Sequence, residues 1–538
     1  MKTDSRMAGQ DVVLGKIKVM FKNITKIKKI KVEDSLQEIQ RFHTALEEAK
    51  KQLEEMYEKA KKEVGESGAA IFEAHKMLLE DESYIGIIEG IVKEQKVNAE
   101  YAVVEATEKV AALFANMSDD YFKERAEDVN VVSEKLILNL TGKGEKHISW
   151  KEPSVLITDK LTAGELLSIG REKISAIVLT RGTHESHVAI LAGMMGIPVM
   201  TGHKIEAADL EDGMEIILYI SEKKIILQPS EEEKQSAIAK REEDQRQREA
   251  LMELRGRACV TKSGKSVHLY ANIGSAGEVE FVKENDAEGI GLFRSEFIYL
   301  GRKQAPDEEE QFQIYKKVAE EMEGRRVIIR TLDIGSDKEV SYLHLDEEAN
   351  PALGYRGIRI CLSNIELFKT QLRAIFRASV YGHISIMYPM IISTEEIEKI
   401  KSIVDEVKEE LKEAGIPYED VEEGIMIETP ASVMMSDELA EMVDFFSIGT
   451  NDLIQYTMAI DRQNEKLESY LKPHHPAILK MIKKVSDSAH RAGKWCGICG
   501  ELASDSALTE EFIEMGIDEL SVVPKYILPL KKLICDMD

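Results

Sequence analysis

The second half of the chain carries charged and reactive side chains just after short strand-like runs, where parallel β-strands would end. They are Arg294, Arg330, Asp333, Lys338, Glu428, Asn451, Asp452, Arg462, Cys499 and Glu501. Two carboxylates from different strands suit Mg²⁺, with water and ligand oxygens filling its other positions. Arginine forks match phosphate and carboxylate groups. The pattern therefore indicates a small, highly anionic ligand that chelates a metal ion.

Each of these residues has a simpler interpretation when taken alone, because a single Arg or Asp at a strand end more often forms a salt bridge. Six or more polar residues at the same end of neighbouring strands favour a binding site instead. The nearby string GYRGIR adds Arg356 and Arg359 at helical spacing. We interpret these two arginines as support for the site or as partners of local acids.

Cys496 and Cys499 form a C-x-x-C pair. A zinc or redox site is one interpretation, but no second pair is present and structural zinc sites usually take four ligands. A thiol that donates or accepts a proton is the favoured interpretation of Cys499. Cys496 then has no direct role.

A second candidate site lies at residues 180–202, where a polar, glycine-containing turn ends at His187 and an apolar helix begins. The positive end of a helix dipole disfavours the imidazolium, so the ring stays neutral and nucleophilic. Adjacent N–H groups can cradle a phosphoryl group. His187 is thus a candidate phosphate acceptor, with an ordinary turn histidine as the alternative. His184 and His187 are three apart, whereas the zinc-protease pattern needs histidines four apart.

The elements that carry the first group of residues alternate between strands and helices. Eight short strands separated by helices over about 275 residues are typical of a (β/α)8 barrel, whose active site lies at the carboxyl ends of the strands. The strand-like strings are VHLYANIG, GIGLFR, RRVIIRTLDIG, HISIMYPMI, EGIMIET, VDFFSIGTND, KWCGICGE and DELSVVP.

The first half predicts three further parts. A helical bundle follows a strand-like run at residues 11–20 and begins with an apolar stripe of Leu36, Ile39, Phe42, Leu46, Ala49, Leu53, Met56 and Ala60. A compact α/β domain spans about 150–228, and the 11–20 strand is a candidate member of its sheet. A charged run, 229–256, predicts a connecting helix capped by Ser230 and Glu233.

Composition limits the possible classes. The 538 residues suggest three or four domains, and the net charge of -27 argues against nucleic acid as a partner. No stretch has the roughly 20 apolar residues that a membrane helix needs. The N-terminus has no apolar core of a signal peptide. Five scattered cysteines fit a reducing cytoplasm.

Several strings together resemble enzyme I of the bacterial phosphoenolpyruvate:sugar phosphotransferase system, and the resemblance covers nearly the whole chain. They are SHVAILA, GIGLFRSEFIYL, RTLDIGSDK, NPALGYRGIRI, IETPAS, DFFSIGTNDLIQYTMAIDR and CGELASD. The barrel strings are shared with pyruvate phosphate dikinase and phosphoenolpyruvate synthase. The resemblance implies a multidomain α/β fold with a phosphohistidine domain, an inserted helical bundle, a linker helix and a C-terminal barrel.

The resemblance also implies roles. His187 would be phosphorylated, Glu428 and Asp452 would bind Mg²⁺, and Cys499 would protonate the enolate to give pyruvate. The phosphoenolpyruvate ligands would be Arg294, Arg330, Lys338, Asn451 and Arg462. The phosphohistidine domain would span 1–21 and 147–228, the part binding the carrier protein HPr 22–146, the linker 229–256, and the dimerising barrel 257–538. The protein would start sugar uptake in the cytoplasm, without membrane insertion.

The histidine neighbourhood departs from the family pattern, which usually reads Gly-Gly-x-Thr-Ser-His followed by Ala-Arg on the helix. Here Thr183, His184 and Glu185 precede the Ser-His pair, and Gly193 follows Ala192. A carboxylate beside a phosphohistidine should repel it, so we expect an altered transfer rate or partner. The chain also ends sooner than most members, which bears on the stability of the dimer.

Three other functions compete with this interpretation. An ATP-dependent dikinase or synthase would carry several hundred residues of ATP-binding domain, whereas only about 180 residues precede His187. A regulatory paralogue would bind phosphoenolpyruvate but transfer phosphate poorly. A barrel lyase would act on a pyruvate enolate, with His187 incidental. Dependence on ATP would identify the dikinase or synthase. Binding of phosphoenolpyruvate without phosphoryl transfer would identify the regulatory paralogue, and the absence of protein labelling would identify the lyase.

Overall fold

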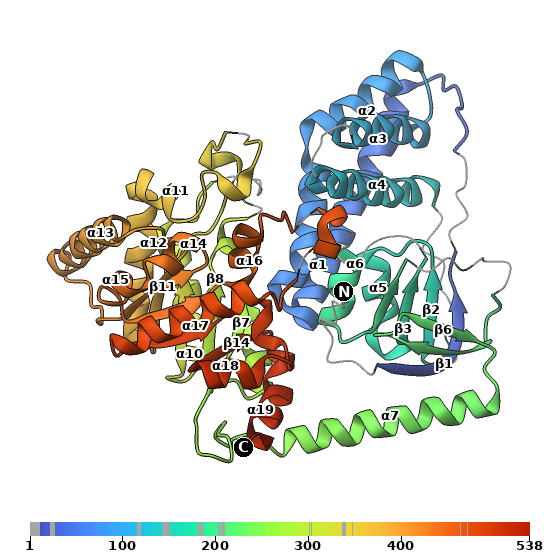
Figure 1. Ribbon diagram of the computed structural model, residues 1–538. Helices are drawn as coiled ribbons and strands as arrows, with labels where there is room; N and C mark the ends of the chain where they lie inside the picture. Colours follow the sequence, from blue (N-terminus) through green and yellow to red (C-terminus); the bar gives the residue numbers. More distant parts are fainter. Residues whose placement is uncertain are drawn as a thin grey trace. The chain divides into compact units, whose positions relative to one another are not determined.

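The computed structural model forms two compact units, residues 1–247 and 248–538 (Figure 1). Each unit has its own hydrophobic cores. Within the described ranges, every helix is too short or too polar to span a bilayer. The described residues are 11–21, 27–115, 120–142, 150, 152–180, 187–202, 205, 210–300, 302, 304–335, 340–346, 348–462, 464–470 and 472–538.

Helices α1 to α4 form the helical part of the first unit (Figure 1). The Asp34 carboxylate caps α1 by accepting from the amides of Leu36 at 2.9 Å and Gln37 at 3.1 Å. The bounds are α1 Ser35–Glu80, α2 Glu82–Gln95, α3 Ala99–Ala115 and α4 Asp120–Thr141.

The apolar stripe predicted on α1 is confirmed for most of its members but is wrong for Leu36. Phe42, Leu53 and Ala60 are buried, whereas Leu36 is 76% exposed. At 100° per residue, Leu36 lies roughly 120° from the centre of the stripe that these residues define. Spacing of three residues alone therefore placed Leu36 on the wrong face.

A six-stranded sheet completes the first unit, in the order β4-β3-β2-β1-β5-β6. Strand β1 pairs in parallel with β2 and antiparallel with β5, although the four helices separate β1 from both in the sequence. Because helices pack on one face and a second apolar cluster covers the other, β2 is buried on both sides. The bounds are β1 Val12–Val19, β2 Ser154–Thr158, β3 Ile174–Leu179, β4 Val199–Thr201, β5 Glu215–Tyr219, β6 Lys224–Leu227, α5 Ala163–Ile169 and α6 His187–Met194.

The charged run folds into helix α7, Glu231–Met252. The predicted cap is confirmed: the Ser230 amide donates to Glu233 Oε2 at 2.8 Å, and the Glu233 amide donates to Ser230 Oγ at 3.3 Å. Ala237 is buried against the sheet, in a small cluster with Val12 and Ile217. The first turns of α7 are thus anchored to the first unit.

The second unit is the predicted (β/α)8 barrel. Its strands are all parallel and close in the order β10-β11-β12-β13-β14-β7-β8-β9. Each of the eight predicted strings overlaps one strand, so this part of the fold is confirmed. The bounds are β7 His268–Ile273, β8 Gly289–Arg294, β9 Arg326–Arg330, β10 Ile384–Tyr388, β11 Glu422–Ile427, β12 Phe445–Ile448, β13 Trp495–Ile498 and β14 Glu519–Val522.

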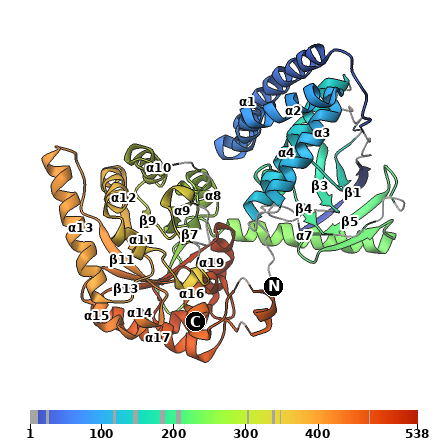
Figure 2. The ribbon, with the colours of Figure 1, turned by 90° about the horizontal axis from the view of Figure 1, so that it is seen from above.

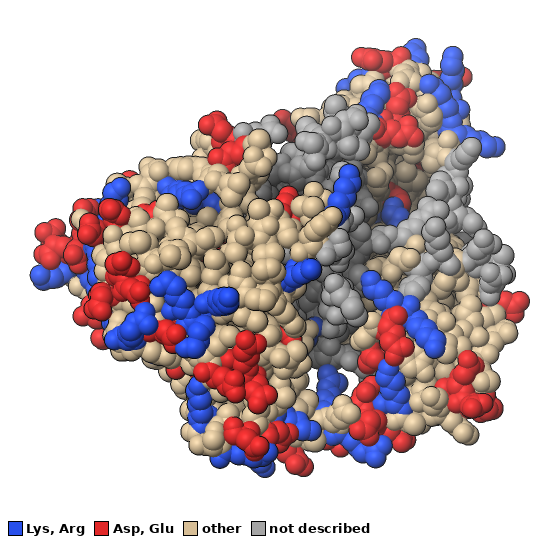
Figure 3. All heavy atoms as spheres, in the orientation of Figure 1, with Lys and Arg blue, Asp and Glu red and all other residues tan. Residues whose placement is uncertain are grey.

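Helices surround the barrel, and α12 and α13 lie side by side (Figure 2). Lys369 and Arg373 of α12 pair with Glu410 of α13 at 2.8 and 2.9 Å. Over the barrel face visible in Figure 3, acidic and basic side chains are intermixed. The bounds are α8 Val279–Glu284, α9 Glu296–Tyr299, α10 Glu308–Glu321, α11 Ile358–Ser363, α12 Ile365–Ala378, α13 Thr394–Glu413, α14 Pro430–Met434, α15 Ser436–Ala440, α16 Thr450–Met458, α17 Pro476–Arg491, α18 Thr509–Met515 and α19 Ile527–Asp536.

An acidic side chain, Glu519 of β14, is buried inside the barrel. Its carboxyl fills the space that Gly291 and Gly497 leave on other strands, where a Cβ atom would overlap it. Burial raises the pKa of Glu519 well above its ordinary value. The folded barrel therefore holds a proton on Glu519 at pH values where the unfolded chain has lost it.

This proton predicts a pH-dependent stability. Stability falls as pH rises from about 4.5 through the raised pKa, by up to about 1.4 kcal/mol per pH unit, because the folded state binds more protons. The Glu519→Gln variant should lack this fall. We expect its melting temperature to exceed that of the wild type by a margin that grows from pH 5 to pH 9. Glu413→Gln, at an exposed position, is the control. A difference in melting temperature that stays the same from pH 5 to pH 9, or one that grows similarly in Glu413→Gln, would contradict the raised pKa of Glu519.

Candidate active site

The predicted site residues of the barrel lie after the carboxyl ends of its strands. Arg294 and Arg330 end the paired strands β8 and β9 and are register partners. Glu428 follows β11, Asp452 lies in the first turn of α16 after β12, and Cys499 follows β13. Because all eight strands are parallel in one closed barrel, these positions share one mouth.

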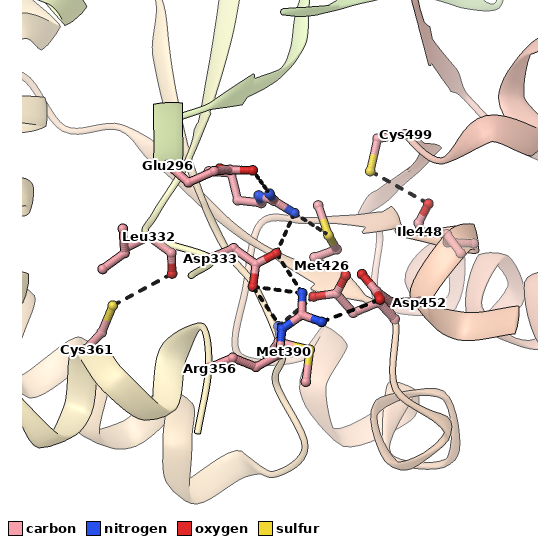
Figure 4. A network of polar contacts seen from close by, with 12 residues as sticks. Glu296, Leu332, Asp333, Arg356, Cys361, Met390, Met426, Ile448, Asp452 and Cys499 are labelled. Atoms are coloured by element: carbon pink, nitrogen blue, oxygen red, sulfur yellow. Dashed lines mark hydrogen bonds and ion pairs between the residues drawn. The ribbon is translucent and has the colours of Figure 1, made fainter. Parts of the chain in front are cut away.

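A buried network of ion pairs occupies this mouth (Figure 4). Arg330 pairs with Glu296 at 2.6 Å and with Asp333 at 2.9 Å. Asp333 also accepts from Arg356 at 3.0 Å, and Arg356 lies 3.6 Å from Asp452. Asp333 thus holds two guanidinium groups in fixed positions.

Both buried arginines keep their charge. Burial would lower the pKa of each, but the surrounding carboxylates outweigh it and raise the pKa of Arg330 and of Arg356. Among the described residues, the Arg330 Nε donor has no hydrogen-bond partner although it is buried. Unpaired buried donors are costly, so a fixed cation with a spare N–H group suits an anionic ligand.

Two buried carboxylates, Glu428 and Asp452, face this cluster. Glu428 Oε1 accepts from the Met390 amide at 2.7 Å, and Met390 adopts a positive φ of 61°. Asp452 Oδ1 has no hydrogen-bond donor within the described residues. Burial, with the charges of Asp452 and Asp333, raises the pKa of Glu428. A bound cation would relieve this repulsion, so the pair fits a divalent metal whose other ligands are water and substrate.

The Asn451 side-chain amide is held in place by Glu501, which lies three residues after the end of β13. Its Nδ2 donates to Glu501 Oε1 at 3.1 Å, and its Oδ1 accepts from the Glu501 amide at 2.9 Å. Asn451 therefore links the ends of two neighbouring strands.

Cys499 lies at the bottom of the mouth, in an apolar cluster that includes Leu292, Met426 and Phe445. The Cys499 thiol donates to the Ile448 carbonyl at 3.7 Å, and the Cys499 carbonyl accepts from Asn272 Nδ2 at 3.0 Å. Burial raises the pKa of the Cys499 thiol to about 12. The group therefore carries a proton at neutral pH, as an acid must.

The zinc interpretation of the C-x-x-C pair gains no support. All five cysteines are free thiols, and Cys496 is buried. In the part of the chain that the structure describes, no three His, Cys, Asp or Glu residues are grouped as metal ligands.

Among the described residues, two predicted ligands, Arg294 and Arg462, are not part of the network. Arg462 lies in the turn after α16, with its side chain exposed and its amide donating to Gln455 Oε1 at 3.1 Å. Lys338 lies outside the described residues. Arg294 is exposed at the end of β8. Glu296 was not predicted as a site residue, although it lies two residues after Arg294. Arg356 pairs with the acids Asp333 and Asp452, which is the second of the two roles expected for it.

His187 is the first residue of α6, as predicted, and Val188, Leu191 and Ala192 bury the helix in the first unit. The His187 side chain and the preceding turn, which includes Glu185, lie outside the described residues. Gly193 is half-buried on α6.

Three family profiles match the chain, and all describe PEP-utilising enzymes. The PEP-binding domain matches residues 248–538, the N-terminal domain 7–125, and the mobile domain 150–222. The barrel is thus the PEP-binding domain of this class.

Relatives named phosphoenolpyruvate-protein phosphotransferase match almost the full length. The Staphylococcus carnosus protein is 41% identical over 94% of this chain and 88% of its own length. The Bacillus subtilis protein is 40% identical over 94% and 90%, and the Listeria innocua protein 39% over 99% and 93%. The chain belongs to the phosphoenolpyruvate-protein phosphotransferase family and is a transferase enzyme. The predicted resemblance is confirmed.

Proposed function

We propose that this protein transfers a phosphoryl group from phosphoenolpyruvate to its own His187 and then to a histidine of the carrier HPr, releasing pyruvate. The observation that carries the proposal is the buried cluster of Arg330, Arg356, Asp333, Asp452 and Glu428 at the mouth of a PEP-binding barrel. Fixed cations and buried acids at one mouth suit a substrate with both phosphate and carboxylate groups.

Substrate binding falls to the arginines and Asn451. Arg330 offers its spare Nε donor, and Arg294 offers an exposed guanidinium beside it. Asn451, fixed by Glu501, can donate or accept a hydrogen bond at the same mouth. Lys338 and Arg462 complete the proposed ligands.

Glu428 and Asp452 would hold Mg²⁺. When bound, the ion neutralises charge on the transferring phosphoryl group and on the enolate. We choose Mg²⁺ because both protein ligands are carboxylates and the remaining ligands would be oxygens.

The chain's own groups complete the reaction. A neutral His187 nitrogen forms a bond to phosphorus while the bond from phosphorus to the enolate oxygen breaks. The enolate carbon then takes the Cys499 proton, which gives pyruvate and a thiolate. A thiol with a pKa of about 12 regains its proton from solvent at neutral pH. The enzyme is then ready for another cycle.

The proposed roles divide along the chain. His187 belongs to residues 1–247 and the donor site to 248–538, with α7 connecting the two units, so transfer requires His187 to reach a phosphoryl group bound in the other unit. We propose that 1–21 and 147–228 carry the phosphohistidine, that 22–146 bind HPr, and that the barrel, 257–538, forms a homodimer. The five free thiols fit a cytoplasmic location.

Removal of divalent metal tests the proposal. Protein incubated with phosphoenolpyruvate, HPr and excess EDTA should lose at least about 100-fold in the rate of HPr phosphorylation, because a metal at a phosphoryl group contributes several kcal/mol. Mg²⁺ in excess of EDTA should restore the rate. Unchanged transfer in EDTA would contradict the metal assignment. Substrate binding without any phosphorylation of HPr in Mg²⁺ would favour the regulatory alternative.

A further inference from the structure

A carboxylate lies behind the substrate-binding arginine and has no part in the roles assigned so far. Glu296 is the first residue of α9, directly after β8, and is only 3% exposed. Its Oε1 accepts from Arg330 Nη2 at 2.6 Å. Figure 4 shows Glu296 and Asp333 reaching one guanidinium group from different elements.

These contacts restrict the orientation of Arg330. Nη2 is bound by Glu296, and Nη1 by Asp333 at 2.9 Å. The Nε donor lacks a hydrogen-bond partner among the described residues. A planar guanidinium held at both terminal nitrogens has little freedom to turn. The remaining N–H groups therefore keep one direction before any ligand arrives.

A second buried polar residue fixes the backbone on both sides of this pair. Gln371 of α12 is 1% exposed. Its Nε2 donates to Ser295 Oγ at 3.0 Å, and its Oε1 accepts from the Leu332 amide at 2.9 Å. Ser295 immediately precedes Glu296, and Leu332 is two residues after Arg330. Gln371 thus ties the end of β8 to the end of β9.

We propose that Glu296 and Gln371 are positioning residues that hold the Arg330 guanidinium in the orientation that binds the phosphate of phosphoenolpyruvate. The inference rests on the proposed function of Arg330 as a phosphate ligand. Neither residue touches the substrate. Glu296 acts because its side chain is long enough to place an acceptor oxygen against Arg330, and its negative charge matters less. An arginine fixed in advance loses less conformational entropy when the phosphate binds.

Three substitutions of Glu296 distinguish the effect of the position of its acceptor oxygen from the effect of its negative charge. Glu296→Ala removes the acceptor and should raise KM for phosphoenolpyruvate about 10-fold or more. It should change kcat less than about 3-fold, because Arg330 holds the phosphate in both ground and transition states. Glu296→Asp keeps the negative charge, but its shorter side chain moves the oxygen away from Arg330. This variant should raise KM about as much as Glu296→Ala does. Glu296→Gln keeps an oxygen in place and should stay within about 3-fold of wild type.

The control is Tyr388→Phe, which removes a hydrogen bond of another buried side chain, the 2.7 Å bond from Tyr388 Oη to Glu423. It should lower the melting temperature without changing KM. Gln371→Leu should raise KM in the direction of Glu296→Ala. Each variant is compared at a temperature well below its own melting temperature, so that KM reports the folded protein.

A double-mutant cycle with Arg330→Ala decides the outcome. If Glu296 acts through Arg330, adding Glu296→Ala to Arg330→Ala should raise KM no further. Two outcomes would overturn the positioning role but leave the proposed phosphate role of Arg330 intact. One is that the two substitutions raise KM additively. The other is a normal KM in both Glu296→Ala and Glu296→Asp while KM is raised in Arg330→Ala. A normal KM in Arg330→Ala would overturn the proposed phosphate role of Arg330 and the inference with it.

Discussion

Replacement of Cys499 by alanine is expected to lower kcat for pyruvate formation by about 10²–10⁴-fold, the usual contribution of a positioned general acid. The thiol is buried at the bottom of the mouth, and its pKa is raised to about 12, so it enters the reaction protonated. KM for phosphoenolpyruvate should change little, since Cys499 makes none of the proposed substrate contacts. Steady-state pyruvate formation with excess HPr measures both constants.

Cys496→Ala is the matched control for this prediction. Cys496 is buried on β13, the strand that Cys499 follows, but it belongs to the main hydrophobic core and not to the cluster around Cys499. Its replacement should cost stability and leave kcat within about 3-fold of wild type. Equal losses of kcat in the two variants, or a normal kcat in Cys499→Ala, would show that the thiol is not the acid.

Replacement of Glu428 by glutamine should lower kcat/KM by about 10³-fold, because a neutral amide is a poor ligand for a divalent cation. The same variant should melt at a higher temperature than the wild type when no metal is present. The charge of ionised Glu428 is opposed by burial and by Asp452 and Asp333, and the amide removes that repulsion. Activity assays in Mg²⁺ and thermal melts in EDTA measure the two effects.

The control for Glu428→Gln is Glu423→Gln on β11, the strand that Glu428 follows. Glu423 bonds the Tyr388 hydroxyl, and burial raises its pKa too. It has no contact with the mouth among the interactions described, so its replacement should leave kcat/KM nearly unchanged. Retained activity in Glu428→Gln, or an equal loss in Glu423→Gln, would contradict the metal-ligand assignment.

The barrel could be predicted from the sequence because each strand is a short apolar run followed by a helix, and this order defines a parallel closed sheet. The mouth residues followed from the same rule, since position after a strand is visible in the chain. Strand β4 was not predicted. It has three residues, Val199–Thr201, which is too few to show a strand pattern beside the apolar helix α6.

The network inside the mouth could not be predicted, because ion pairing depends on distances across the fold. Nothing in the order of residues shows that Glu296 binds Arg330, or that Asp333 bridges to Arg356. The positive φ of Met390, which orients its amide toward Glu428, has no local signal such as glycine. Arg462 shows the converse: its sequence position fits the family pattern, but its side chain is exposed.

The sequence placed His187 at the start of a helix, and α6 begins there. The effect of Glu185 and Gly193 on transfer stays a prediction: the neighbouring carboxylate should repel a phosphohistidine and change the transfer rate.

The central claim is that the barrel donates a phosphoryl group to His187. The most direct test incubates the wild type and His187→Ala with Mg²⁺ and phosphoenolpyruvate labelled in its phosphate. The wild type should acquire label that is labile in acid and stable in alkali, and HPr should remove it. The variant should acquire none. Label on His187→Ala equal to the wild type, or pyruvate exchange without any labelled protein, would contradict the account.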